Sequence, residues 1–168
     1  MKGNRGHMIR TRETPNDVFY TPSLVAQTHI KSIKADPNDV WYDPFKGKGV
    51  YYDNFPTNNK EWSEITDGKD FFESSYKVDV ICSNPPYSCM DEVLKKSVEL
   101  NPRVISYLLL EGKITPKRLE YMNNAGYGLS GMYICKVYEW YGMTIAYTFT
   151  KGSKNTAEVI YDRIKHKA

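Results

Sequence analysis

The chain has 168 residues, a formal net charge of +3 and a hydrophobic content of 40%. This length suits one domain with its own core, and no stretch approaches the ~18–20 apolar residues of a membrane-spanning helix. The N-terminus lacks the apolar centre of a secretory signal peptide. We therefore expect a cytoplasmic protein without a membrane partner.

The cysteines give no sign of a disulfide framework or a metal centre. Cys82, Cys89 and Cys135 are odd in number and form no CxxC pair, and the three histidines are scattered without ligand spacing. We expect reduced thiols and no metal site, with Cys89 as a small buried filler.

The mild positive charge permits a polyanionic partner such as nucleic acid without requiring one. Residues 1–15 are basic and contain little that could be buried. They fit either a solvated tail or a flexible basic arm that follows a phosphate backbone, and the sequence does not separate the two. Residues 153–168 are interpreted as a polar tail.

Apolar patterning between residues 20 and 150 predicts alternating helices and strands. The expected elements, in chain order, are a helix capped by Thr21 and reaching residue 33, strands at 40–43, 62–65 and 78–83, a helix opened by a capping box of Ser88 and Asp91, a strand at 104–110, a helix between Thr115 and Gly126, and strands at 129–138 and 143–149. The short link between the last two strands suits an antiparallel hairpin. The order predicts an α/β fold with a mainly parallel sheet, finished by that hairpin.

Three polar residues fall at predicted strand ends, where ligands bind in such sheets: Asp43, Glu64 and Asn84. Glu64 follows Asp43 by 21 residues, near the ~20-residue spacing at which an acidic strand end meets a ribose diol. Gly47 and Gly49 lack side chains and let the backbone approach a ligand closely. They form neither GxGxxG nor a P-loop, so a structural turn explains them equally well by themselves.

The most informative stretch is Asn84-Pro85-Pro86-Tyr87, which follows an apolar, β-branched run. The two prolines force the backbone out of the sheet and display an amide, a carbonyl and an aromatic face together. The aromatic amine of a base is a poor nucleophile, because its lone pair is delocalised into the ring. Acceptors from Asn84 and Pro85 on its N–H groups favour a pyramidal nitrogen, and Tyr87 can stack on the base.

In combination, the segments DPFKGKG, an acidic second strand, DFF and SNPPY resemble the class I S-adenosylmethionine-dependent methyltransferases, which have a Rossmann-like fold. Within that class they are most similar to the N6-adenine DNA methyltransferases, especially the small forms of phages and other viruses. The resemblance covers the chain from about Tyr20 to the final hairpin. It implies a site-specific, adenine-specific DNA methyltransferase whose cofactor is S-adenosyl-L-methionine.

The resemblance also implies which residues form the site. The implied cofactor-binding residues are Tyr20, Thr21, Asp43, Gly47, Gly49, Glu64, Asp70 and Phe71, and the implied catalytic residues are Asn84, Pro85, Pro86 and Tyr87. Asp43 and the glycines would hold the methionine part, Glu64 the ribose and Asp70 the adenine amino group, with Phe71 against the ring. Thr21 is also explained by helix capping alone. The family often has small residues where this chain has Lys46 and Lys48, which leaves cofactor, phosphate and solvent open for both.

Other acceptors and a non-enzymatic role stay open. The related possibilities are an amino group in RNA and a glutamine amide in a protein, because an amide poses the same nitrogen problem. A third possibility is a catalytically silent module that binds cofactor or nucleic acid. The chain has no room for a sizeable target-recognition domain, so specificity is expected from short loops, the basic arm, or a homodimer or partner subunit. Trp140 and Tyr141 could stack on nucleic acid or simply pack in a hairpin.

Overall fold

The computed structural model describes residues 21–137, 140 and 142–165. The predictions made for residues 1–15, for Tyr20 and for Tyr141 lie outside the described residues. None of the helices in the described part of the chain has the length and apolarity that crossing a lipid bilayer requires.

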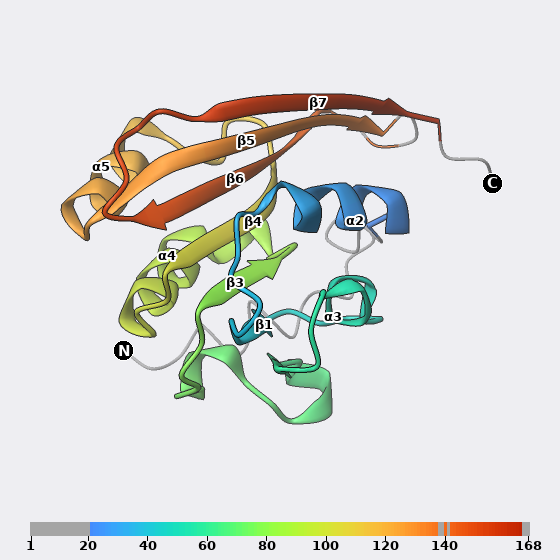
Figure 1. Cartoon of the computed structure of the whole chain (residues 1–168), viewed down its shortest axis with the longest axis vertical. Coiled ribbons are helices and arrows are strands. Elements are labelled where there is room, and N and C mark those ends of the chain that lie inside the picture. The colour runs from blue at the N-terminus through green and yellow to red at the C-terminus, as the bar shows by residue number, and fades with distance from the viewer. Residues whose placement is uncertain (1–20, 138–139, 141, 166–168) are drawn as a thin grey trace.

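A seven-stranded mixed sheet, in the order β2-β1-β3-β4-β6-β5-β7, forms the centre of the described chain (Figure 1). Its strands are β1 (Trp41–Asp43), β2 (Lys60–Trp62), β3 (Val80–Ser83), β4 (Val104–Leu110), β5 (Tyr127–Val137), β6 (Thr144–Lys151) and β7 (Glu158–Ile164). Strands β2, β1, β3 and β4 are parallel neighbours, and β6 pairs antiparallel with both β4 and β5. The sheet confirms the predicted α/β class, the Rossmann-like parallel part and the antiparallel hairpin.

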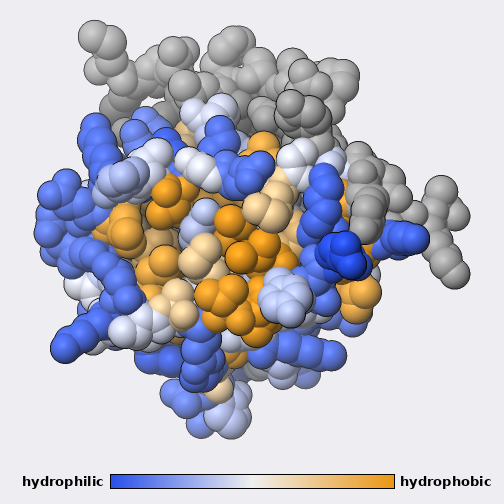
Figure 2. Space-filling model, turned by 90° about the horizontal axis from the view of Figure 1, so that it is seen from above, coloured by the Kyte–Doolittle hydropathy of each residue, from blue (hydrophilic) through white to orange (hydrophobic). Residues whose placement is uncertain are grey.

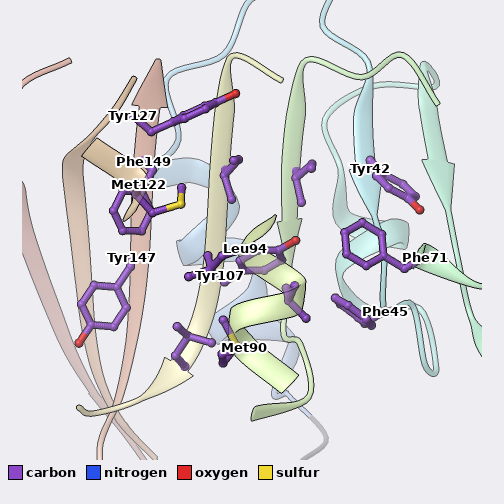
Figure 3. Packing of buried hydrophobic residues seen from close by; sticks show 14 of the residues in the cluster. Tyr42, Phe45, Phe71, Met90, Leu94, Tyr107, Met122, Tyr127, Tyr147 and Phe149 are labelled. Carbon is purple, nitrogen blue, oxygen red and sulfur yellow. The ribbon is translucent and has the colours of Figure 1, made fainter. Parts of the chain in front are cut away.

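Helices cover both faces of the sheet. They are α2 (Ser23–Ser32), α3 (Val50–Asn54), α4 (Met90–Glu99) and α5 (Pro116–Asn124), with short 3-10 turns η2 (Ile65–Asp67), η3 (Phe71–Glu73) and η4 (Tyr87–Cys89). Side chains of β4 alternate between the faces: Val104 and Leu108 pack with α2 and α3, whereas Ile105 and Leu109 pack with α4 and α5. This period of two lets one strand serve both halves of the core. Figure 3 shows the α4–α5 half, which runs from Tyr42 to Phe149.

The predicted ends of α5 are confirmed. The Thr115 hydroxyl accepts a hydrogen bond from the Arg118 backbone N–H at 3.3 Å, and Pro116 is the first helical residue. Pro116 lacks an N–H, which a first turn leaves unpaired in any case. Beyond the helix, Gly126 has φ of 92°, the left-handed conformation that glycine adopts without strain.

Three local predictions are wrong. Thr21 does not cap α2, whose N-cap is Pro22 without a side-chain hydrogen bond. The second strand is residues 60–62 rather than 62–65, because the Glu64 carboxylate caps η2 and turns the chain out of the sheet. No capping box opens α4: η4 comes first, and Asp91 Oδ1 accepts from Arg118 Nε at 2.7 Å instead.

The interpretation of residues 153–168 as a polar tail is also wrong for residues 158–164. Residues 158–164 form β7, which pairs parallel with β5 at the sheet edge. Val159, Ile160 and Tyr161 favour strands, and they are exposed large hydrophobic side chains. Figure 2 looks onto the molecule from the β7 side and shows apolar side chains gathered in the middle of that face. The segment therefore gains its stability from pairing with β5 rather than from burial.

A buried polar chain ties α2 to the rest of the fold. His29 is fully buried, with Nδ1 2.9 Å from Tyr51 Oη and Nε2 2.7 Å from Ser106 Oγ. Ser106 Oγ lies 2.7 Å from Thr148 Oγ1, so the chain joins α2, α3, β4 and β6. Burial lowers the pKa of His29 from 6.5 to about 3.

We expect His29→Gln to remove an acid-sensitive contribution to stability. The folded pKa lies below the unfolded one, so the unfolded chain binds the extra proton between pH 6.5 and about 3. The free energy of unfolding of the wild type, relative to the variant, should fall as pH falls below 6.5. The slope should be about 1.4 kcal/mol per pH unit. Urea unfolding at several pH values measures it, and parallel curves for the two proteins would contradict the prediction.

Candidate functional site

The candidate site lies where the strand order reverses. The chain passes from β1 to its neighbour β2 on one side, and β3 later adds to the other side of β1. Ligands of open α/β sheets bind beyond the carboxyl ends of the strands at such a switch point. Strand β1 ends at Asp43 and β3 ends at Ser83, immediately before Asn84. The fold thus brings two of the predicted strand-end residues to its switch point.

Asp43 is a fully buried carboxylic acid with one oxygen unpaired. Its Oδ1 accepts from Ser83 Oγ at 2.6 Å and from the Phe45 backbone N–H at 3.3 Å. Its Oδ2 is buried and has no hydrogen-bond partner among the described residues. Burial raises the pKa of Asp43 from 3.8 to about 7, against the opposing effect of the Ser83 hydrogen bond. An unpaired buried oxygen is unfavourable, so this position fits a ligand that donates hydrogen bonds or carries positive charge.

Backbone hydrogen bonds fix the loop after β1. The Gly49 N–H donates to the Lys46 carbonyl at 2.8 Å, and the Lys46 N–H donates to the Ser63 carbonyl at 3.0 Å. Gly47 and Gly49 have φ of 52° and 90°, which favours glycine at both positions. A Cβ built on Gly47 would meet nothing within 4 Å, so there is open space beside this backbone.

Glu64 lies against this loop. Its Oε2 accepts from the Gly47 N–H at 2.7 Å, and its Oε1 accepts from the Thr66 N–H and hydroxyl at 3.3 and 3.2 Å. The side chain is 6% exposed. Glu64 therefore links the segments that follow β1 and β2. Each carboxylate oxygen has two lone pairs, so Glu64 could also accept hydrogen bonds from ribose hydroxyls.

Asp70 and Phe71 lie beyond β2 in different surroundings. Asp70 is half-buried, and its Oδ1 accepts from the Phe72 N–H at 2.9 Å as the cap of η3. Phe71 is 2% exposed and packs edge-on against Phe45, with ring centroids 5.1 Å apart. The structure thus makes Phe71 a core residue, shown with Tyr42 and Phe45 in Figure 3.

The Asn84 side chain meets Thr21. Asn84 Nδ2 donates to Thr21 Oγ1 at 3.1 Å, and among the described residues its Oδ1 accepts no hydrogen bond. Asn84 is half-buried, whereas Thr21 is 8% exposed. In this amide orientation, which follows from the hydrogen-bond partner, the carbonyl oxygen is the group left to accept from a ligand. Thr21 therefore stands beside the acceptor residues rather than the Asp43 loop.

The remaining residues of the motif form a firm exit from the sheet. Pro85 and Pro86 are buried, and Tyr87 is half-buried at the start of η4. Lys113 Nζ, from the segment after β4, lies 6.0 Å from the centroid of the Tyr87 ring. The motif thus sits between α2 and the loop after β4.

Two functional neighbours were missed from sequence. Ser83 donates to Asp43, and the only available indication was that a small polar residue ended an apolar run. The spacing of His29 indicated no ligand role, and the structure places this residue in the buried polar chain behind β3, with Cys82 Sγ 3.9 Å from its Nε2. Neither contact could be found from spacing, because 40 and 53 residues separate the partners.

A separate groove of about 720 Å³ lies between α2 and strands β5 to β7. Thr28, Lys31, Arg103 and Glu158 are among its lining residues, and it shares none with the candidate site. Within the described residues, no group of three or more His, Cys, Asp or Glu side chains could hold a metal ion.

No protein-family model matches the chain, and no curated protein sequence matches it either. Among solved structures, it is similar to the M protein of the type I restriction enzyme EcoKI, with a TM-score of 0.65 and 14% identity over 90% of this chain and 50% of that one. A candidate class I S-adenosylmethionine-dependent methyltransferase from Listeria monocytogenes gives 0.64 and 11%, over 94% and 70%. A candidate RNA methyltransferase from Pyrococcus horikoshii gives 0.57 and 15%, over 81% and 88%.

The chain spans about half the length of the EcoKI M protein. At these low identities the similarity shows a common fold: this chain has the Rossmann-like fold that these methyltransferase structures share.

We expect Asp43→Asn to change the pH dependence of stability in the opposite sense to His29→Gln. The folded pKa of Asp43 is about 7, so the native protein binds the extra proton between pH 3.8 and 7. Its contribution to the free energy of unfolding falls as pH rises through this range. The variant should therefore gain on the wild type by about 1.4 kcal/mol per pH unit from pH 4 to 7. A constant difference in chemical denaturation across that range would show that Asp43 titrates normally.

Proposed function

We propose that this protein is a methyltransferase that transfers a methyl group from S-adenosyl-L-methionine to the N6 amino group of adenine in DNA. One observation carries the proposal. Among the described residues, the Asn84 amide oxygen accepts no hydrogen bond and the buried Asp43 Oδ2 has no partner, and the two residues stand at the ends of adjacent strands, β3 and β1. The first suits an amino group to be methylated, and the second suits a cationic cofactor.

The residues present fit the cofactor. The unpaired Asp43 Oδ2 would accept from its ammonium group. Open space beside Gly47 would take the methionine part, whereas the Asp53 side chain already fills the space beside Gly49. Glu64 would accept hydrogen bonds from the ribose hydroxyls, and Asp70 would accept from the adenine amino group. Phe71 is 2% exposed, so it would contact the adenine ring with only a small part of its side chain. Tyr20 completes the proposed set outside the described residues.

S-adenosylmethionine supplies a methyl group that is already activated by its bond to a sulfonium, so the protein mainly orients and polarises the acceptor. Asn84 Oδ1 and the Pro85 carbonyl would accept from the two N–H groups of the amine and favour a pyramidal nitrogen. Pro86 fixes the backbone that presents them, and Tyr87 would stack on the base, which stabilises a bound base by ~1–3 kcal/mol. A base in duplex DNA would be flipped out first.

The choice of DNA is supported by the likeness to the EcoKI M protein, a subunit of a restriction enzyme. The likeness to a candidate RNA methyltransferase favours RNA as the second candidate. A glutamine amide poses the same chemical problem and is the third acceptor. Sequence specificity would come from short loops, from a second copy or from a partner subunit.

The test is an acceptor survey. The full chain is incubated with S-adenosylmethionine carrying a labelled methyl group and, separately, with duplex DNA, single-stranded DNA, RNA and a protein extract. Modified nucleosides and residues are identified by mass spectrometry. We expect N6-methyladenine from DNA, and a loss of at least 100-fold in rate for Asn84→Ala, because about 3 kcal/mol of polarisation is removed.

The matched control is Asn124→Ala, which alters an exposed asparagine at the C-terminal end of α5. Label in RNA or in glutamine, abolished by Asn84→Ala, would replace DNA by that acceptor. Tight cofactor binding without transfer to any acceptor would replace the enzyme by a binding module.

We expect Thr21→Val to lower kcat about tenfold while the dissociation constant of the cofactor stays unchanged. The substitution keeps the shape but removes the acceptor that orients Asn84 Nδ2, a hydrogen bond of about 1.4 kcal/mol. Thr21→Ser should retain most of the rate. Isothermal titration and steady-state kinetics separate the two effects. A fall in cofactor affinity at constant kcat would return Thr21 to the cofactor-binding residues.

A further inference from the structure

A cluster of lysines and aromatic rings lies at the β2 edge of the sheet. Its members are Lys46, Tyr52, Lys60, Trp62 and Lys69, and we call it the lysine–aromatic patch. Lys60 and Trp62 are two residues apart on β2, so they point to the same face of this outermost strand. Tyr52 comes from α3, Lys46 from the loop after β1, and Lys69 from the turn after β2.

The ammonium groups of the patch lie close to the ring faces. Lys46 Nζ and Lys69 Nζ are 4.1 and 3.8 Å from the centroid of the Trp62 ring. Lys60 Nζ is 4.4 Å from the Tyr52 ring centroid and donates to the Tyr52 carbonyl at 2.9 Å. Cation–π attraction acts at distances below about 6 Å, so each of these contacts is stabilising.

The three lysines of the patch form no ion pair within the described chain. The ion pairs of the described residues use Lys34, Lys96, Arg103 and Arg118, and none uses Lys46, Lys60 or Lys69. Three ammonium groups around two rings repel one another, and ring contacts offset that repulsion only in part. A polyanion would be attracted to the patch and would release its own counterions on binding.

The patch is fixed beside the candidate site. Trp62 is the register partner of Asp43 in the parallel β1–β2 pair. The Lys46 backbone is bonded to the Ser63 carbonyl, and the neighbouring Gly47 N–H to Glu64. On the far side of Asn84, Lys113 follows β4 and lies near the Tyr87 ring. Positive charge therefore flanks the site along the β2-β1-β3-β4 edge, over three strand spacings of ~4.8 Å each, or about 14 Å.

We propose that the lysine–aromatic patch binds the phosphate backbone of the nucleic acid whose base enters the site. The inference rests on the proposed function and assigns a surface to its polymer substrate. The patch and Lys113 lie about 14 Å apart along this edge, which is close to the ~12 Å width of the major groove of duplex DNA. The two strands of the duplex could therefore each contact one of these positive regions while the extruded base enters the site between them. The contacts with the Trp62 and Tyr52 rings hold the lysines together at this edge, so they present their charge to a polymer as one group.

The experiment measures binding without methyl transfer. A fluorescein-labelled duplex oligonucleotide is titrated with the full chain, in the absence of cofactor, at several salt concentrations between 50 and 200 mM. The compared protein is the triple variant Lys46→Gln, Lys60→Gln and Lys69→Gln. Each phosphate contact contributes about 0.9 to the slope of log K against log salt. We expect the triple variant to lose about 2.7 from that slope, which is about a 40-fold difference over a fourfold change in salt.

The matched control removes three lysines that lie away from the β2 edge. Lys31 lies on α2, Lys151 is the last residue of β6 and Lys154 follows it, and all three are exposed. Changing all three to Gln alters the net charge equally, so a general charge effect would appear in both variants. We expect the control to keep the wild-type slope within about 1. Thermal unfolding of both variants checks that the fold is retained.

The outcomes separate this inference from the proposed function. An unchanged slope in the patch variant, with methylation intact in the wild type, overturns the proposal that the patch binds nucleic acid. The proposed methyltransferase function then still stands. Equal losses in the patch and control variants also overturn it, because the attraction is then unspecific. Binding to vesicles of anionic lipid through these lysines, without binding to DNA or RNA, replaces nucleic acid by a membrane surface. A wild type that methylates no nucleic acid overturns the proposed function itself.

Discussion

The buried Asp43 carboxyl is the constraint on which the site depends. A carboxylate removed from water must be hydrogen-bonded, neutralised or paired with a cation. Here Ser83 and the Phe45 backbone satisfy one oxygen, and the other is left without a partner. The fold therefore holds an acidic group in a state that a cationic ligand would relieve. The hydrogen-bonded sheet around it maintains this arrangement, because Asp43 belongs to a strand paired on both sides.

Strand β3 couples the two halves of the site. Its last residue, Ser83, donates to Asp43, and the next residue, Asn84, donates to Thr21. The side chains of successive residues leave a strand on opposite faces, so one short segment reaches toward β1 and toward the start of α2. Pro85 and Pro86 then prevent the ladder from continuing. A shift of β3 by one residue would turn Ser83 and Asn84 to the opposite faces and break both contacts. The register of β3 is therefore a condition for any chemistry at this edge.

The sequence allowed the prediction of features that local chemistry determines. The apolar run before Asn84 could be placed as a strand because prolines bound it, and the cap at Thr115 because Pro116 follows it. Features decided by distant partners were missed. Glu64 was expected to continue a strand, but its carboxylate caps a turn and holds Gly47. Residues 158–164 were interpreted as tail, since only pairing with β5 makes them a strand.

The same division holds for the candidate site. Asp43 and Asn84 could be predicted to lie close together because parallel strands share a carboxyl edge. The structure places them at the ends of neighbouring strands. The contact of Thr21 with Asn84 spans 63 residues and has no counterpart in any local pattern. Likewise, Lys46 and Lys69 reach the Trp62 ring from two separate segments, so only the folded chain shows that they converge.

The two buried titrating groups have a joint consequence for proton binding. Between pH 4 and 6.5, the native protein holds a proton on Asp43 that the unfolded chain releases, and it refuses one on His29 that the unfolded chain accepts. The two differences cancel, so folding in this range involves almost no net proton exchange through these groups. A cation bound beside Asp43 would expel its proton and break that balance. Ligand binding would then be coupled to proton release, and the liganded protein alone would become less stable on acidification.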